Sequence, residues 1–145
     1  SDLPKTTPGF RTDGGQRAPV PTPATGSADA PVLDPTLLES LRTLRFDGEA
    51  DPVAEIIDLF LRDTPSRLQE ASEAARRRDG AGLRAAAHTL KGSANNLGAR
   101  RLGAAAGRLE TEAMAGCWDH VGELLQAATA ELRALEPELR DQRAR

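Results

Sequence analysis

Residues 83–99 read LRAAAHTLKGSANNLGA, and the apolar residues in this stretch recur at the spacing of one face of an α-helix. Glycine is common directly after the last residue of a helix, and Gly98 holds that position here. The stretch therefore predicts a helix that ends near Leu97 and buries one narrow side. The residues on that side are Leu83, Ala86, Ala87, Leu90, Ala94 and Leu97.

Helical patterns also occupy most of the chain on both sides of this stretch. A short helix is predicted after Asp34, which suits an N-cap, with Pro35 at the first helical position. Longer helices are predicted over residues 53–78, 102–116 and 118–136. Because only a few residues separate consecutive helices, neighbouring helices should run antiparallel. The sequence therefore predicts an all-α fold: an antiparallel up-down-up-down four-helix bundle with a short additional N-terminal helix.

Two prolines and the chain ends limit this prediction. Pro65 removes one backbone donor, so we expect it to kink or break the second helix. We expect the chain to fray from Pro137 onward, so the bundle should span residues 32–140, with a frayed tail at 141–145. Residues 1–31 are rich in Pro, Gly, Thr and Ser and hold few large apolar side chains, which predicts a disordered linker that follows a further domain.

The composition excludes several classes of protein. Aromatic residues make up 3% of the 145 residues, which argues against a β-sandwich or barrel. A net charge of −3 argues against a nucleic-acid binder, and the short run at residues 76–78 fits a solvated helix end. No run of about 18 apolar residues is present to span a membrane. A single cysteine permits no internal disulfide, so we expect a cytoplasmic protein.

His88 lies beside the buried stripe of the central helix. Arg84, Lys91, Gly92 and Asn95 stand at offsets that share its helix face. Glycine inside a helix is about 1 kcal/mol less favourable than alanine, and bare backbone at Gly92 would give a partner access to His88. A neutral imidazole is available near pH 7 and is a nucleophile that forms covalent intermediates. Lys91 is placed to neutralise a phosphoryl group on the ring, so this strip is a candidate phosphoryl-transfer site.

Other roles for the two histidines and the cysteine have weaker support. A metal site at His88 would need further ligands, but no second His follows at one helical turn and Lys91 would repel a cation. Ser93 is not part of a nucleophile-elbow motif. On these grounds alone, the alternative that His88 is an ordinary surface or partly buried residue remains open. We predict no role for Cys117, at the edge of the core, or for His120, a surface or partly buried residue.

The sequence HTLKGSANNLGA, residues 88–99, resembles the signature of histidine-containing phosphotransfer (HPt) domains, H-x-L-K-G-(S/A)-(S/A)-x-x-L-G-(A/G). The resemblance covers about residues 33–140 and implies a four-helix bundle with a short leading helix. It also implies that an exposed His88 is the phospho-acceptor. The residues that match the signature are His88, Leu90, Lys91, Gly92, Ser93, Ala94, Leu97, Gly98 and Ala99.

The resemblance also points to a residue on the following helix. Family members commonly carry Gln or Glu 22 residues after the histidine, facing its second ring nitrogen, and this position is Glu110 here. A carboxylate on Nδ1–H would fix the tautomer and leave Nε2 as the attacking atom. The alternative is that Glu110 is an exposed acid paired with Arg84 or Arg108.

The function implied is that of a phosphorelay intermediate, as at the C-terminus of bacterial hybrid sensor histidine kinases. His88 would take a phosphoryl group from a receiver-domain aspartyl phosphate and pass it to another receiver, with Lys91, Gly92, Glu110 and Arg84 in support. Receiver domains are the expected partners, and they would supply Mg²⁺, whereas this domain is expected to be monomeric and to need no cofactor. It would have no autonomous catalysis.

The receiver is expected to dock on the His88 face and the adjoining surface of the second helix. We expect an apolar patch there with polar groups around it, and Ala85, Asn95 and Ala99 are candidates for its rim. Two other functions share the same fold. One is the substrate domain of a chemotaxis-type histidine kinase, which an acidic residue at position 110 favours. The other is a helical module that binds a partner without phosphotransfer.

Overall fold

The computed structural model describes residues 30–44, 48 and 50–145, and within these residues it contains five helices and no strands. Residues 31–145 form one compact unit. The predicted linker at residues 1–31 lies outside the described residues except for Ala30 and Pro31, and so does part of the turn before the second helix. The helices are α1 (Thr36–Arg42), α2 (Pro52–Arg76), α3 (Gly80–Leu97), α4 (Arg100–Ala115) and α5 (Val121–Ala144).

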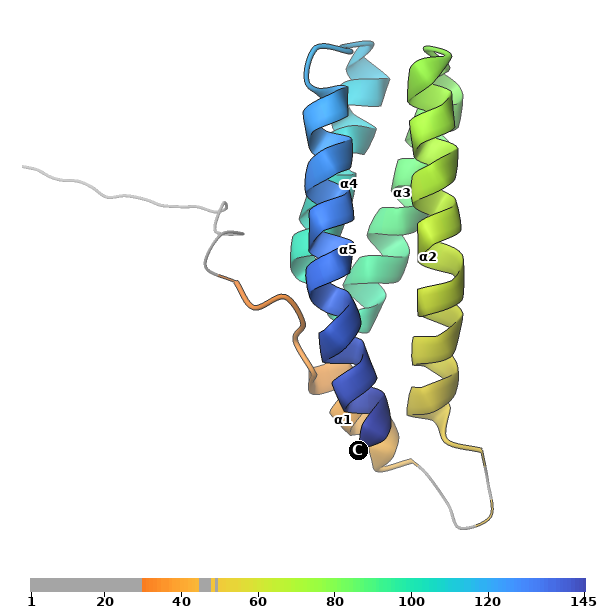
Figure 1. The fold of residues 1–145 in the computed structure, drawn as a ribbon, viewed down its shortest axis with the longest axis vertical. Helices are drawn as coiled ribbons and strands as arrows, with labels where there is room; N and C mark the ends of the chain where they lie inside the picture. The colour runs from red at the N-terminus through yellow and green to blue at the C-terminus, as the bar shows by residue number, and fades with distance from the viewer. Residues whose placement is uncertain (1–29, 45–47, 49) are drawn as a thin grey trace, which may run out of the picture. The chain divides into compact units, whose positions relative to one another are not determined.

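The four long helices form a bundle in which each packs against its two neighbours, α2 against α3 and α5, and α4 against α3 and α5. Figure 1 shows successive helices running in alternating directions. Side-chain contacts agree with this: Asn95 of α3 lies against Gly103, and His88, two turns earlier in α3, lies against Glu110, two turns later in α4. The predicted all-α four-helix bundle with a short leading helix is confirmed.

The predicted apolar stripes form the core of the bundle. All six stripe residues of α3 are buried, as is the stripe of α4 that faces them. Because many of these residues are alanine, α3 and α4 approach closely, and their polar side chains at the edge of this contact meet one another. The buried stripe of α4 contains Leu102, Ala105, Ala106, Leu109 and Ala113.

Local capping explains where the helices begin and end. The Asp51 side chain accepts a hydrogen bond from the Val53 amide at 3.0 Å, and the Asp79 side chain accepts one from the Gly82 amide at 2.9 Å. Gly98 ends α3 with φ of 102°, a conformation that favours glycine. These caps fix the length of α3, and with it the position of His88 along the bundle.

The short helix α1 begins one residue later than predicted. Pro35 is its N-cap residue, and the Asp34 carboxylate accepts a hydrogen bond from the Thr36 amide at 3.1 Å. The apolar side chains of this helix are only partly covered, because Leu38 is buried whereas Leu37 is 38% exposed. Leu37 therefore presents an apolar side chain to solvent beside the bundle.

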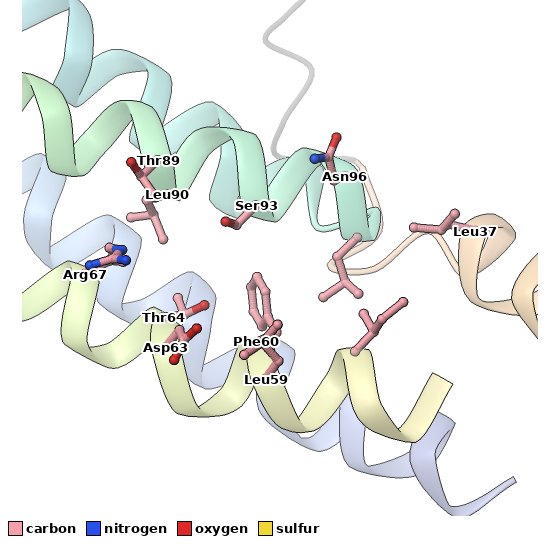
Figure 2. A pocket seen from close by; sticks show the side chains of 12 residues that line it. Leu37, Leu59, Phe60, Asp63, Thr64, Arg67, Thr89, Leu90, Ser93 and Asn96 are labelled. Carbon is pink, nitrogen blue, oxygen red and sulfur yellow. The ribbon is translucent and has the colours of Figure 1, made fainter. Parts of the chain in front are cut away.

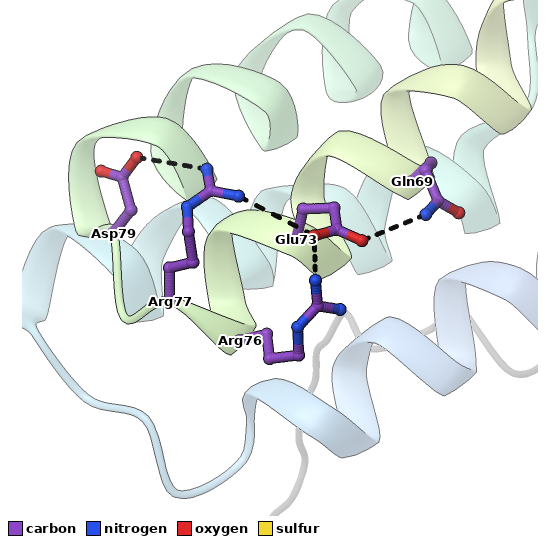
Figure 3. Close-up of polar contacts among 5 residues, drawn as sticks. All are labelled: Gln69, Glu73, Arg76, Arg77 and Asp79. Atoms are coloured by element: carbon purple, nitrogen blue, oxygen red, sulfur yellow. Dashed lines mark hydrogen bonds and ion pairs between the residues drawn. The ribbon is translucent and has the colours of Figure 1, made fainter.

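The arginine run at residues 76–78 closes the end of α2. Figure 3 shows Glu73 at the centre of this cluster, paired with Arg76 and, at 3.8 Å, with Arg77. Arg78 instead lies over the ring of Trp118, 5.4 Å from its centroid. The predicted solvated helix end is therefore paired within its own helix and packed against the loop before α5.

The second helix continues through Pro65 without a break. A proline lacks the amide hydrogen that would bond to the carbonyl four residues earlier. Thr64 and Leu68, on either side of this position, are both buried. Packing of α2 against the core therefore maintains the helix, and the predicted break does not occur.

The prediction that the chain frays from Pro137, with a tail at 141–145, is wrong. Helix α5 continues to Ala144. Leu139 is completely buried beyond the proline, and the Arg143 guanidinium pairs with Asp58 of α2 at 2.7 and 2.9 Å. Burial and this ion pair hold the last turns of α5 in place, which a local rule about proline does not anticipate.

Leu139→Ala is expected to destabilise the protein by about 2–5 kcal/mol, the range for large-to-small changes at buried sites. A frayed terminus would instead give a change near zero. Urea unfolding followed by circular dichroism measures the difference. Glu138→Ala, at a neighbouring position that is not buried, is the matched control and is expected to stay within about 0.5 kcal/mol.

Among the described residues, none of the helices combines the length and the apolar character that a membrane-spanning helix requires.

Candidate functional site

His88 lies midway along α3 with its side chain 68% exposed. Its Nδ1 is 2.8 Å from Oε2 of Glu110, which α4 contributes from the adjacent side of the bundle. This contact holds one nitrogen of the ring, while most of the side chain remains open to solvent. The ring is therefore fixed in orientation and still accessible to another protein.

Glu110 connects His88 to Lys91. The Lys91 Nζ lies 2.6 Å from Oε1 of Glu110, and the carboxylate side chain is only 12% exposed. The hydrogen bond from Lys91 lowers the pKa of Glu110 most, and the bond to His88 lowers it further, whereas burial acts in the opposite direction. A charged carboxylate only accepts hydrogen bonds, so Nδ1 carries the proton in this contact and Nε2 is unprotonated in the neutral ring.

The lowered pKa has a consequence for stability. The folded-state pKa of Glu110 lies below its ordinary value of 4.5. A carboxyl group of this kind contributes its full stabilisation of the fold at a pH above the ordinary pKa. The contribution is lost as the pH falls through the folded-state pKa. At neutral pH, Glu110 is therefore ionised and its bonds to Lys91 and His88 are both present.

The structure assigns partners that sequence patterns left open. Glu110 contacts His88 and Lys91, rather than Arg84 or Arg108. Lys91, considered from the sequence as a neutralising charge for a phosphoryl group, here neutralises the carboxylate. The Lys91 ammonium and the His88 imidazole therefore contact different oxygens of the same carboxylate, Oε1 and Oε2.

Gly92 leaves an open surface next to His88. A Cβ atom built at this position would have no other heavy atom within 4 Å apart from its own helix. A side chain at Gly92 would therefore not disturb the bundle and would project outward beside the imidazole. The fold itself does not require glycine at this position.

Arg84 and Asn95, the remaining residues of the predicted strip, differ in their surroundings. Arg84 is exposed and forms no ion pair with any other described residue. The Asn95 side chain lies against α4, where a Cβ on Gly103 would be only 2.0 Å from its Oδ1. Arg84 is thus free to meet a partner, whereas Asn95 packs along the contact between α3 and α4.

A groove of about 270 Å³ lies between α2 and α3 (Figure 2). On the surface of α3, Gly92 separates this groove from His88. The floor of the groove is apolar, and the exposed Leu37 of α1 and Leu59 of α2 are among the residues that line it. Figure 2 shows the side chains of Asp63 and Arg67 on α2 across from those of α3. The residues of α3 that line it are Thr89, Leu90, Ser93, Asn96 and Leu97. An apolar groove with polar borders therefore adjoins the His88 face.

The groove differs from the predicted patch in its border residues. Asn96 borders it, whereas Asn95 lies against α4, and Ala99 is fully buried. Ala85 and Asn95 are both exposed on the surface of α3, but neither of them lines the groove. Thr89 and Asn96 are polar residues two helical turns apart, so the sequence places them on one face of α3. The sequence does not tell whether that face lies toward α2.

Cys117 and His120 are not part of this site. Cys117 is exposed, rather than at the edge of the core as predicted, because it follows the helix end at Gly116. His120 is exposed as well, with its Nδ1 3.6 Å from Glu123. Among the described residues, no three His, Cys, Asp or Glu side chains gather in a way that could hold a metal ion.

Comparisons with known proteins identify the family. The sequence matches the model of the Hpt domain family over residues 55–138, which is more than half of the chain. Among solved structures, histidine-containing phosphotransfer protein B (HptB) from Pseudomonas aeruginosa PAO1 is similar, with a TM-score of 0.71 and 28% sequence identity over 79% of this chain and 96% of that chain. No curated protein matches. The chain therefore belongs to the Hpt domain family and is a phosphorelay intermediate of two-component signalling.

Proposed function

We propose that His88 is the residue that carries the phosphoryl group. The observation that supports this most is the geometry of the ring: Nδ1 is held at 2.8 Å by Glu110, and the side chain is mostly exposed. His120, the other histidine, precedes α5, and its one described ion pair is a 3.6 Å contact with the solvent-exposed Glu123. Only His88 combines a fixed tautomer with an accessible nitrogen.

The reaction is an in-line transfer between two proteins. The lone pair of His88 Nε2 forms a bond to phosphorus as the bond from phosphorus to the aspartyl oxygen of a receiver breaks, which releases the aspartate carboxylate. The ring keeps its Nδ1 proton and gains positive charge, and the Glu110 carboxylate stabilises that charge. Transfer from His88 to a second receiver follows the same steps in reverse.

Charge neutralisation on this chain would come from two cations. Lys91 lies on the carboxylate next to the ring, and Arg84 is exposed one turn away on α3. Phosphoryl transfer depends mainly on positioning and charge neutralisation, so few groups are needed. The receiver would supply Mg²⁺, and this chain would bind no cofactor of its own.

The receiver would dock across the surface from the groove to His88. Gly92 lies between the groove-lining residues of α3 and the imidazole, and its missing side chain allows close approach. Arg67 and Asp63 at the border would add polar contacts around an apolar centre, as in protein interfaces generally. We propose that the domain acts as a monomer, with one receiver bound at a time.

The phosphoryl donor decides between this function and its nearest alternative. The full chain is incubated either with a phosphorylated receiver and Mg²⁺ or with an isolated histidine-kinase core and ATP. We expect labelling within minutes from the receiver and little from the kinase core. Labelling only from the kinase core and ATP would instead indicate a chemotaxis-type substrate domain, which the carboxylate of Glu110 favours, and labelling from neither would indicate a binding module.

Lys91→Ala is expected to slow phosphoryl acceptance by a few-fold to about tenfold, because a half-exposed charge is worth about 1 kcal/mol. Loss of its hydrogen bond should also raise the pKa of Glu110 toward the ordinary value. Rapid-quench assays and a carbon-13 NMR titration of Glu110 measure the two effects. Arg108→Ala on α4 is the control and should change neither; an unchanged transfer rate in Lys91→Ala would contradict the role of this cation.

A further inference from the structure

Gly107 lies within α4 directly under the side chain of Lys91. A Cβ built at Gly107 would be 3.3 Å from Cδ of Lys91, closer than side chains normally approach. Gly107 is not among the glycines with positive φ, so its backbone does not require glycine. What its missing side chain supplies is therefore space for the stem of Lys91.

The path of Lys91 over α4 follows from helix geometry. A helical side chain leans toward the N-terminus of its own helix, so Lys91 leans toward the level of His88. Because α4 runs antiparallel to α3, this direction leads along α4 from Gly107 to Glu110, about one turn later. The stem crosses Gly107 before its ammonium reaches Oε1 of Glu110 at 2.6 Å.

Each oxygen of the Glu110 carboxylate has a separate partner. Oε1 accepts from Lys91 and Oε2 meets Nδ1 of His88 at 2.8 Å. Because the carboxylate is planar, holding Oε1 also fixes the direction in which Oε2 points. A shift of Lys91 would therefore release the carboxylate to rotate away from the imidazole.

We propose that Gly107 is a positioning residue for phosphotransfer, because the space above it keeps Lys91 on Glu110 and thereby keeps Glu110 on His88. This inference rests on the proposed roles of His88 and Glu110. Gly107 touches neither reacting atom, and it acts only through Lys91. Glycine is unfavourable inside a helix, so a purely structural view predicts that alanine at this position is harmless or beneficial.

The test compares Gly107→Ala and Gly107→Val in the full chain, each alone and combined with Lys91→Ala. Gly122→Ala is the matched control, because a Cβ there would meet no atom within 4 Å. One readout is the titration of the Glu110 carboxyl by carbon-13 NMR, which requires no phosphotransfer. The other is the rate of phosphoryl acceptance from a phosphorylated receiver.

We expect the pKa of Glu110 to rise in the order wild type, Gly107→Ala, Gly107→Val, with the last close to Lys91→Ala. Acceptance should slow in the same order, and neither Gly107 change should add to the loss already caused by Lys91→Ala. Gly122→Ala should match the wild type in both readouts. These results would support the positioning role, whatever the change in thermal stability.

Two results would overturn the inference. One is an unchanged Glu110 titration in Gly107→Ala and in a folded Gly107→Val, and if the valine variant does not fold, the alanine variant decides alone. The other is a loss of rate that persists in full in the Lys91→Ala background. Failure of this inference can be distinguished from failure of the proposed function. If the proposed function is wrong, His88→Gln retains its phosphoryl label, whereas the titration of Glu110 still shows whether Gly107 positions Lys91.

Discussion

Replacing His88 with glutamine is expected to abolish phosphoryl acceptance completely while the bundle stays folded. The amide of glutamine cannot form the phosphoramidate bond, so no slower route through this position remains. The fold should tolerate the change, because the side chain is 68% exposed and its one described polar contact is with Glu110. We expect the free energy of unfolding to change by less than about 1 kcal/mol.

The matched control is His120→Gln. This histidine is as exposed as His88, at 70% of its side chain, but it lies at the start of α5, where its described ion pair is with the exposed Glu123. Transfer of radioactive phosphate from a phosphorylated receiver should be unchanged in this variant. Label retained by His88→Gln and lost by His120→Gln would reverse the assignment.

Replacing Gly92 with glutamine is expected to slow transfer by about 10- to 100-fold without weakening the fold. A side chain at Gly92 meets no atom of the bundle, so it would stand out from α3 between the groove and His88. A receiver would then be held away from the imidazole, and a misplacement of about 1 Å is enough to cost about 100-fold. Glutamine adds no charge, so the effect would be steric.

Stability separates this effect from unfolding. Glutamine is a better helix former than glycine, so Gly92→Gln should raise the free energy of unfolding by up to about 1 kcal/mol. Gly122→Gln, also into open space but in α5, is the control and should transfer at the wild-type rate. A Gly92→Gln variant that is more stable and equally fast would show that the receiver does not approach over this position.

Much of the fold was predictable from the sequence because the apolar spacing and the capping residues agree. The stripe around Leu90 and the end at Gly98 define α3 without any tertiary information. The last turns of α5 were not predictable, because they depend on burial of Leu139 and on the pairing of Arg143 with Asp58. Proline rules describe local cost, and here tertiary contacts outweigh it.

The site was predictable to the level of a helix face but not to the level of contacts. Spacing placed Lys91 beside His88, yet the ammonium binds Glu110 from the neighbouring helix. Asn95 and Asn96 are adjacent in sequence but point to different sides of α3, one toward α4 and the other toward the groove. A single sequence does not state on which flank of a helix each neighbour packs, so these partners required the structure.

Mapping of the modified residue shows whether His88 alone carries the phosphoryl group. The full chain is phosphorylated by a receiver, digested with trypsin at neutral or alkaline pH and sequenced by mass spectrometry. Cleavage after Arg84 and Lys91 releases AAAHTLK, which contains His88 alone among histidines, whereas His120 falls in the fragment of residues 109–133. We expect one acid-labile, base-stable phosphoryl group, on His88 in AAAHTLK. A phosphoryl group on the 109–133 fragment, or an acid-stable one on Thr89, would contradict this expectation.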